Sequence, residues 1–134
     1  MGDFRDADGV LRGAADTLDL DEPVAVMLIA LLHLFRDSDR PGELVARYMA
    51  AVPPGSFLAV SHLTADFGGM EAAAASLDED MAEPMVLRDR AGVARFLDGL
   101  ELVEPGVVAV DQWHPDGSTP PGRASNYGAV GRKP

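Results

Sequence analysis

The feature that most constrains this chain is an apolar run of eleven residues, Val24 to Leu34, in which His33 is the one polar side chain. An acidic turn, RDSD, follows one residue later. The run is too short to cross a bilayer, for which about 20 apolar residues are needed. Continuous apolarity without alternation is typical of a strand in a parallel sheet that is covered on both faces. A buried helix is the alternative, because periodicity alone does not separate the two.

The residues that follow favour the strand. Ser38 or Asp39 is a suitable helix cap, Pro41 would lie in the first helical turn, and PPG at 53–55 would end the helix. A second apolar run, SFLAVSHL, comes next at 56–63. A strand, a helix and a strand in this order predict a right-handed βαβ unit whose two strands are parallel.

The remaining segments predict helices alternating with short strands, judged by apolar spacing and by the positions of glycine and proline. Helices are expected near residues 11–18, 68–84 (alanine-rich) and 88–100. The last of these would point Val93, Phe96 and Leu97 inward. Strands are expected over 101–113, interrupted at Pro105-Gly106, and over 126–134.

Composition excludes several functions. With 134 residues the chain has the length of one domain. Its net charge of −11 argues against binding to nucleic acid or to an anionic membrane, because both require a basic surface. The absence of cysteine excludes disulfides, thiol nucleophiles and cysteine metal sites. We expect a soluble, cytoplasmic protein.

Five segments carry a resemblance that extends over the whole chain. In their order and spacing they resemble the C-terminal part of the S-adenosylmethionine-dependent methyltransferase family common in actinomycetes. The resemblance implies a class I, Rossmann-like α/β fold, of which residues 1–134 would form a single domain, the C-terminal half. The segments are GDFRDAD (2–8), LDLDEPVAVMLIALLHLF (18–35), GSFLAVSHLTAD (55–66), RFLDGLELVEPG (95–106) and YGAVGRKP (127–134).

The strand order of that family is 3-2-1-4-5-7-6. The chain would contain strands 4-5-7-6, mostly parallel with an antiparallel last strand, covered by about three helices. It would lack the glycine-rich loop after the first strand and the acidic residue after the second, both of which bind the cofactor. Gly68-Gly69 is no substitute, because it follows the fifth strand and lacks the G-x-G-x-x-G spacing. We therefore expect S-adenosylmethionine to bind only together with the missing N-terminal half.

The resemblance also implies a catalytic residue. His33, after the fourth strand, would act as a general base that removes a hydroxyl proton from the methyl acceptor. An unperturbed imidazole pKa near 6.5 suits that role at neutral pH. The alternative for His33 is a structural role at the strand end.

Binding residues follow from the same resemblance. Asp3, Phe4 and Leu32 would contact the cofactor, with Asp3 accepting a hydrogen bond from the adenine amino group and Phe4 beside the ring. Ser61 and His62, at the end of the fifth strand, would line the acceptor pocket, although alternation points only one of them inward. No metal is expected, because no H-x-E-x-H or H-x-x-x-H pairing occurs.

Two functions remain open. The first is a truncated methyltransferase, inactive alone, whose complete form transfers a methyl group to oxygen or nitrogen of a small acceptor. The alternative is a non-catalytic binding or assembly protein that keeps the half-domain and associates through its open sheet edge. In either case we expect the Val24–Leu32 edge to form a homodimer or to bind a complementing half-domain, because an unpaired apolar edge is hard to sustain in a monomer.

Overall fold

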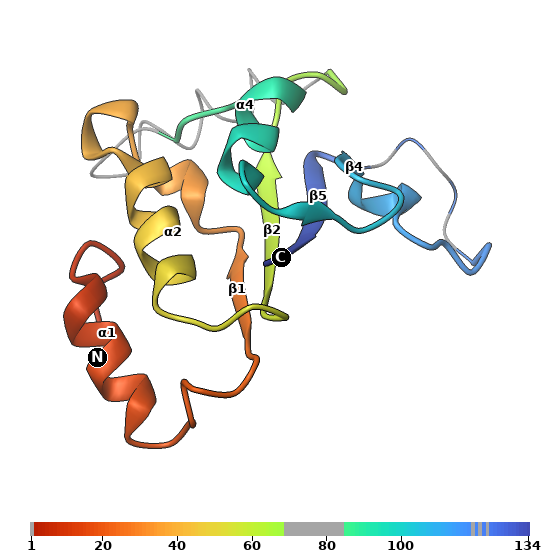
Figure 1. The fold of residues 1–134 in the computed structure, drawn as a ribbon. Coiled ribbons are helices and arrows are strands. Elements are labelled where there is room, and N and C mark those ends of the chain that lie inside the picture. Colours follow the sequence, from red (N-terminus) through yellow and green to blue (C-terminus); the bar gives the residue numbers. More distant parts are fainter. Residues whose placement is uncertain (1, 69–84, 119, 121, 123) are drawn as a thin grey trace.

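The computed structural model describes residues 2–68, 85–118, 120, 122 and 124–134, in which helices and strands alternate along the chain (Figure 1). The alanine-rich helix expected within 68–84 lies outside the described residues. The helices are α1 (Ala7–Ala15), α2 (Pro41–Ala50) and α4 (Arg90–Ala94), the strands are β1 (Ala25–Ile29), β2 (Phe57–Leu63), β3 (Glu101–Leu102), β4 (Val108–Ala109) and β5 (Asn126–Arg132), and short 3-10 turns are η1 (Leu32–Leu34), η2 (Asp37–Asp39), η3 (Arg95–Leu97) and η4 (Val110–Gln112).

The strands form a five-stranded mixed sheet with the order β1-β2-β5-β3, and β4 also pairs with β5. β1 and β2 are parallel and are joined through α2, so the βαβ unit expected from the sequence is confirmed. β5 is antiparallel to β2, β3 and β4. This order and these directions match the expected partial sheet 4-5-7-6 with an antiparallel last strand, in which β3 and β4 are two pieces of one interrupted strand.

β1 is shorter than the apolar run from which it was predicted. Ala30 has a left-handed φ of 52°, so the chain leaves the sheet there. The amide of Ala30 donates to the hydroxyl oxygen of Ser61 on β2 (2.9 Å), which stabilises this turn. His33 therefore lies in the 3-10 turn η1 and not on a strand.

The expected burial of β1 on both faces is also wrong. Leu28 is buried, whereas Met27 and Ile29 are 65% and 53% exposed. The strand therefore alternates between a covered face and an open face, and the sequence concealed this because the side chains on both faces are apolar.

The start of α2 differs from the prediction as well. Asp39 does not cap α2, because its carboxylate accepts a hydrogen bond from the amide of Arg36 (2.9 Å) and closes the turn η2. Arg40, with a φ of 52°, occupies the cap position without a side-chain hydrogen bond, and Pro41 follows in the first helical turn as expected.

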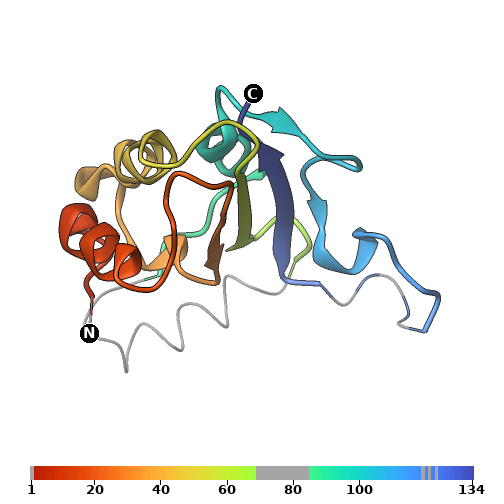
Figure 2. The same ribbon diagram turned by 60° about the horizontal axis from the view of Figure 1, so that its bottom comes forward.

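The helices lie in one layer, with α2 between α1 and η3 (Figure 2). Val93, Phe96 and Leu97 are buried, as predicted. They join side chains of α2, β1, β2 and β5 in a single apolar core. Among the described residues, no helix is long and apolar enough to span a membrane.

The interruption predicted at Pro105-Gly106, within the strand expected over 101–113, is present. β3 ends at Leu102, and β4 begins at Val108. The Glu104-Pro105 bond between them is cis, and Gly106 has a φ of 82°, a conformation that glycine adopts readily. Both pieces pair with β5, so the break leaves the sheet order unchanged.

Candidate functional site

A polar cluster lies beyond the carboxyl ends of the parallel strands β1 and β2. We name it the Arg88 cluster; it consists of His33, Asp37, His62, Arg88 and Phe96. His33 comes from η1, and His62 is the penultimate residue of β2. Ligands of open α/β sheets bind at this end of parallel strands, so the cluster is the candidate functional site.

Arg88 connects the members of the cluster. Its side chain is only 9% exposed. The guanidinium donates to the backbone oxygens of Leu32 (3.1 Å) and Phe35 (2.9 Å), on either side of His33. It also pairs with the carboxylate of Asp37 at 3.0 Å. A planar group with five donors can serve several acceptors at once, and here it fixes the backbone that carries His33.

The tautomer of His62 follows from its two partners. Nη1 of Arg88 lies 2.8 Å from Nε2 of His62, and the guanidinium can only donate. Nε2 must therefore accept, and Nδ1 carries the proton, which it donates to the backbone oxygen of Leu63 (2.7 Å). Burial and the charge of Arg88 lower the pKa of His62 to about 4, although the bond to Leu63 opposes them. His62 is thus a neutral, fully hydrogen-bonded imidazole at pH 7.

His33 differs from His62 in its hydrogen bonding. The two rings meet edge to face with centroids 6.1 Å apart. His33 is 7% exposed, and its Nδ1 is buried without a hydrogen-bond partner among the described residues. Burial and then the charge of Arg88 lower the pKa of His33 below its ordinary value. The ring is therefore neutral at pH 7, which is the form that can accept a proton.

The other residue proposed for the acceptor pocket, Ser61, has a local contact. Its hydroxyl accepts the amide of Ala30 at the end of β1. His62 faces the core and is fully buried, whereas Ser61 is partly exposed on the opposite face of β2. The alternation expected from the sequence is therefore present, and it separates these two side chains.

Asp3 and Phe4 lie near the start of α1, apart from the two histidines. The Oδ1 atom of Asp3 accepts the amide of Arg5 (2.9 Å), and the Asp3 side chain is 63% exposed. The ring of Phe4 stacks on Tyr48 (centroids 5.2 Å apart) and contacts Phe35 (4.9 Å). Leu32, the third residue expected to contact the cofactor, is fully buried. Phe35 links the two regions, because its backbone oxygen also binds Arg88.

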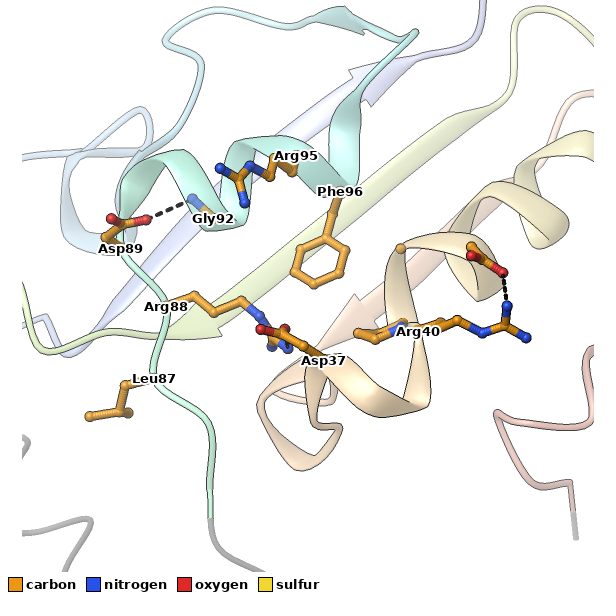
Figure 3. Close-up of a pocket in the computed structure, with 11 residues that line it drawn as sticks. Asp37, Arg40, Leu87, Arg88, Asp89, Gly92, Arg95 and Phe96 are labelled. Carbon is orange, nitrogen blue, oxygen red and sulfur yellow. Dashed lines mark hydrogen bonds and ion pairs between the residues drawn. The ribbon is translucent and has the colours of Figure 1, made fainter.

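A pocket of about 570 Å³ opens beside the cluster, between the start of α2 and the segment that contains α4 (Figure 3). Arg88 and Phe96 form part of its wall, with the guanidinium carbon 5.2 Å from the ring centroid. His62 stacks on Phe96 (centroids 6.0 Å apart) without lining the pocket itself. Side chains of both charges line the pocket, among them Arg40 and Glu43, which form an ion pair (3.3 Å).

Sequence reasoning missed Arg88 and Phe96 as site residues. Arg88 follows three apolar residues, Met85 to Leu87, which is the one feature of the sequence that indicates an inward-pointing side chain. Two of its four partners are backbone oxygens, which leave no trace in the sequence. Phe96 was expected only as a core residue of the third helix. Within the described ranges no group of three or more His, Asp or Glu side chains could hold a metal ion.

The fold and the site define an open α/β protein with its polar cluster beyond a parallel pair of strands. A family model described as S-adenosyl methyltransferase matches residues 1–134. The chain belongs to this S-adenosyl methyltransferase family. A search of curated proteins gave no match.

Solved structures agree with this assignment. A DUF574 family protein from Streptomyces avermitilis MA-4680 is 40% identical, with a TM-score of 0.90, over 99% of this chain and 53% of that one. A putative methyltransferase from Thermobifida fusca YX is 29% identical, with a TM-score of 0.87, over 98% and 52% of the two chains. An O-methyltransferase family protein from Burkholderia thailandensis, 15% identical with a TM-score of 0.62, shares the fold. The chain spans about half the length of the first two.

The family implies S-adenosylmethionine as cofactor, and the residues present fit it only in part. Asp3 offers a largely exposed carboxylate, and Phe4 is an aromatic ring nearby. The sequence contains no glycine-rich loop between a strand and a helix that could hold the rest of the molecule. This chain alone therefore supplies at most one end of a cofactor site.

Proposed function

We propose that this chain is the C-terminal, acceptor-side half of an S-adenosylmethionine-dependent methyltransferase that acts on oxygen or nitrogen of a small molecule. The observation that carries the proposal is the family match over all 134 residues, together with the 40% identity to a protein about twice as long. The half-domain would be inactive alone, because it lacks the glycine-rich loop and the ribose-binding acid.

The bound cofactor would supply a methyl group on a positively charged sulfur. Asp3 and Phe4 would contact its adenine end, and Leu32 would pack nearby. Most of the rate enhancement would come from holding the acceptor in line with the methyl group in a cleft without water. The Arg88 cluster, to which His62 belongs, would shape the acceptor side of that cleft.

His33 would remove the acceptor's proton. Its neutral ring at pH 7 is ready to accept one, and Arg88 fixes the backbone on both sides of it. The Nδ1 atom of His33 is buried without a hydrogen-bond partner among the described residues, so the proton would enter at Nε2. Burial and the charge of Arg88, which lower the pKa of His33, would then favour its release.

The test uses a completed protein, in which the part of the Streptomyces avermitilis relative that this chain does not match precedes residue 1. Transfer of a labelled methyl group is measured against a panel of phenols, alcohols and amines. We expect transfer to at least one class, and His33→Ala should lower turnover by roughly 10²-fold or more with little effect on cofactor affinity.

His114→Ala is the matched control, because this histidine lies in an exposed loop and contacts the backbone oxygen of Glu104. It should leave turnover unchanged. Equal turnover of the His33→Ala and His114→Ala proteins would assign His33 a structural role. No transfer to any acceptor by a folded, cofactor-binding protein would refute the proposed activity.

The alternative is a non-catalytic assembly protein. The exposure of Met27 and Ile29 on β1 favours it, because exposed apolar side chains on an edge strand are typical of an interface. The same completed protein separates the two functions: an assembly protein would form a stable complex and transfer no methyl group.

A further inference from the structure

The pocket beside the Arg88 cluster is lined by three arginines and three carboxylates, and four of these six side chains neutralise one another. Arg88 pairs with Asp37 at 3.0 Å. Arg40 pairs with Glu43 at 3.3 Å, one turn further along the start of α2. These two ion pairs leave one carboxylate and one arginine of the pocket wall to be accounted for.

The remaining carboxylate has a partner, whereas the remaining arginine does not. The carboxylate of Asp89 accepts the amide of Gly92 (2.7 Å) and caps α4. Arg95, the first residue of η3, is exposed, and its guanidinium has no hydrogen bond or ion pair among the described residues. Figure 3 shows no interaction drawn to Arg95, whereas a dashed line joins Arg40 to its partner on α2. The donors of Arg95 can therefore bind a ligand that accepts hydrogen bonds.

Apolar side chains supply another part of the wall. They are Pro41 in the first turn of α2, Leu87 before α4 and Phe96 in η3. The ring of Phe96 is held between neighbours, with His62 stacked on it (centroids 6.0 Å apart) and the guanidinium carbon of Arg88 5.2 Å from its centroid. The pocket volume of about 570 Å³ lies within the range of small-molecule sites, roughly 300–1,000 Å³. The pocket therefore suits a small molecule that has an apolar body and an anionic group.

Gly42 keeps the space between α2 and Arg95 open. It has a helical backbone conformation without a positive φ, so the chain does not require glycine there. It lies three and seven residues before the buried Val45 and Met49, on the face of α2 that packs against η3. A Cβ atom at Gly42 would meet nothing within 4 Å among the described residues outside its own helix backbone. A larger side chain at this position would therefore fill part of the pocket.

We infer that this pocket binds a small molecule in which a single carboxylate is attached to an apolar body, with the carboxylate on the guanidinium of Arg95. The planar guanidinium matches a carboxylate through two parallel hydrogen bonds. A monoanion suits the pocket better than a dianion, because one lining arginine is unpaired among the described residues and three carboxylates share the wall. The inference goes beyond the proposed function, because neither His33 nor His62 lines the pocket.

The probe is benzoate, titrated into the 134-residue chain while the amide signals are followed by NMR. We expect saturable shifts at Gly42, Gly92 and Arg95 and none in α1. Two analogues of the same shape separate the contributions of charge: benzamide is neutral, and phenyl phosphate is a dianion above neutral pH. Each should bind at least about tenfold more weakly than benzoate, because the first lacks the charge-assisted hydrogen bonds and the second meets the three carboxylates.

Two pairs of variants test the walls of the pocket. Arg95→Met should lower the affinity for benzoate at least about tenfold. Arg12→Met is its matched control, because Arg12 is an exposed arginine of α1 away from the pocket, and it should leave the affinity unchanged.

Gly42→Leu should also lower the affinity, by filling the space beside Arg95. Gly13→Leu is the matched control, since Gly13 is an exposed helical glycine of α1 at which a Cβ atom likewise meets nothing within 4 Å. Leucine is the better helix former, so both glycine variants should keep or raise the melting temperature. A loss of affinity in Gly42→Leu alone therefore reports on the pocket and not on unfolding.

The carboxylate has two sources, the methyl acceptor itself or a separate carboxylic acid, and the completed protein distinguishes them. Benzoate would raise the KM of a carboxylate-bearing acceptor in the first case and leave it unchanged in the second, and both results agree with the inference. Equal affinities for benzoate and benzamide, tighter binding of phenyl phosphate, or equal effects of Arg95→Met and Arg12→Met would overturn it. The binding measurements do not depend on methyl transfer, so the proposed function can fail separately.

Discussion

At the scale of single residues, Arg88 determines the chemistry of the candidate site. It donates to His62, to two backbone oxygens beside His33 and to Asp37. The two histidines were predictable as candidates, because each lies near the carboxyl end of an apolar run that contains a strand. Arg88 was not predictable, because hydrogen bonds to backbone oxygens depend on the fold and leave no pattern in the sequence.

The low pKa of His62 makes the stability of the protein depend on pH. With a folded pKa of about 4 against an ordinary value near 6.5, the unfolded chain binds the proton more readily. The stability that His62 contributes is therefore fully present above about pH 6.5 and is lost as the pH falls toward 4. The loss is on the order of 3 kcal/mol.

We predict that Arg88→Met raises the pKa of His62, because the positive charge and the donor to Nε2 are both removed. The rise is only partial, since burial, the larger cause of the shift, remains. Titration of the His62 ring by NMR measures it. Arg95→Met, which removes an exposed arginine of the same pocket, is the control and should leave the titration unchanged. Identical titrations of His62 in the two variants would contradict the assigned role of Arg88.

At the scale of elements, the C-terminal end of β1 is the boundary that could not be predicted from the sequence. The order of strands and helices was predictable, because apolar runs, prolines and glycines mark them directly. The left-handed turn at Ala30 was not, since alanine gives no sign of a positive φ. The strand was therefore expected to reach Leu32 with His33 directly after it, whereas β1 ends at Ile29 and His33 lies in the turn η1.

The turn at the end of β1 depends on Ser61. We predict that Ser61→Ala lowers the free energy of unfolding by about 1 kcal/mol, because the amide of Ala30 then keeps only the longer bond, 3.3 Å, to the backbone oxygen of residue 61. Denaturant unfolding measures the change. Ser38→Ala, at an exposed position in η2, should be neutral, and equal losses in both variants would exclude a special role for the Ser61 hydroxyl.

At the scale of the whole molecule, the described residues form part of a methyltransferase sheet with its own core, and β1 lies at one edge of that sheet. The sequence allowed this to be predicted through the order of its segments and through the absence of a glycine-rich loop. It could not show which face of β1 would be open, because both faces are apolar. The net charge of −11 favours solubility, whereas the exposed Met27 and Ile29 form an apolar surface on β1.

We propose that this chain is the half of a methyltransferase that does not hold the cofactor by itself. Calorimetric titration of S-adenosylmethionine into the purified 134-residue chain, alone and after completion by the complementary half of the Streptomyces avermitilis relative, tests it most directly. We predict no measurable binding to the chain alone and micromolar binding after completion, because the glycine-rich loop and the ribose-binding acid then become available. Micromolar binding to the chain alone would contradict the account.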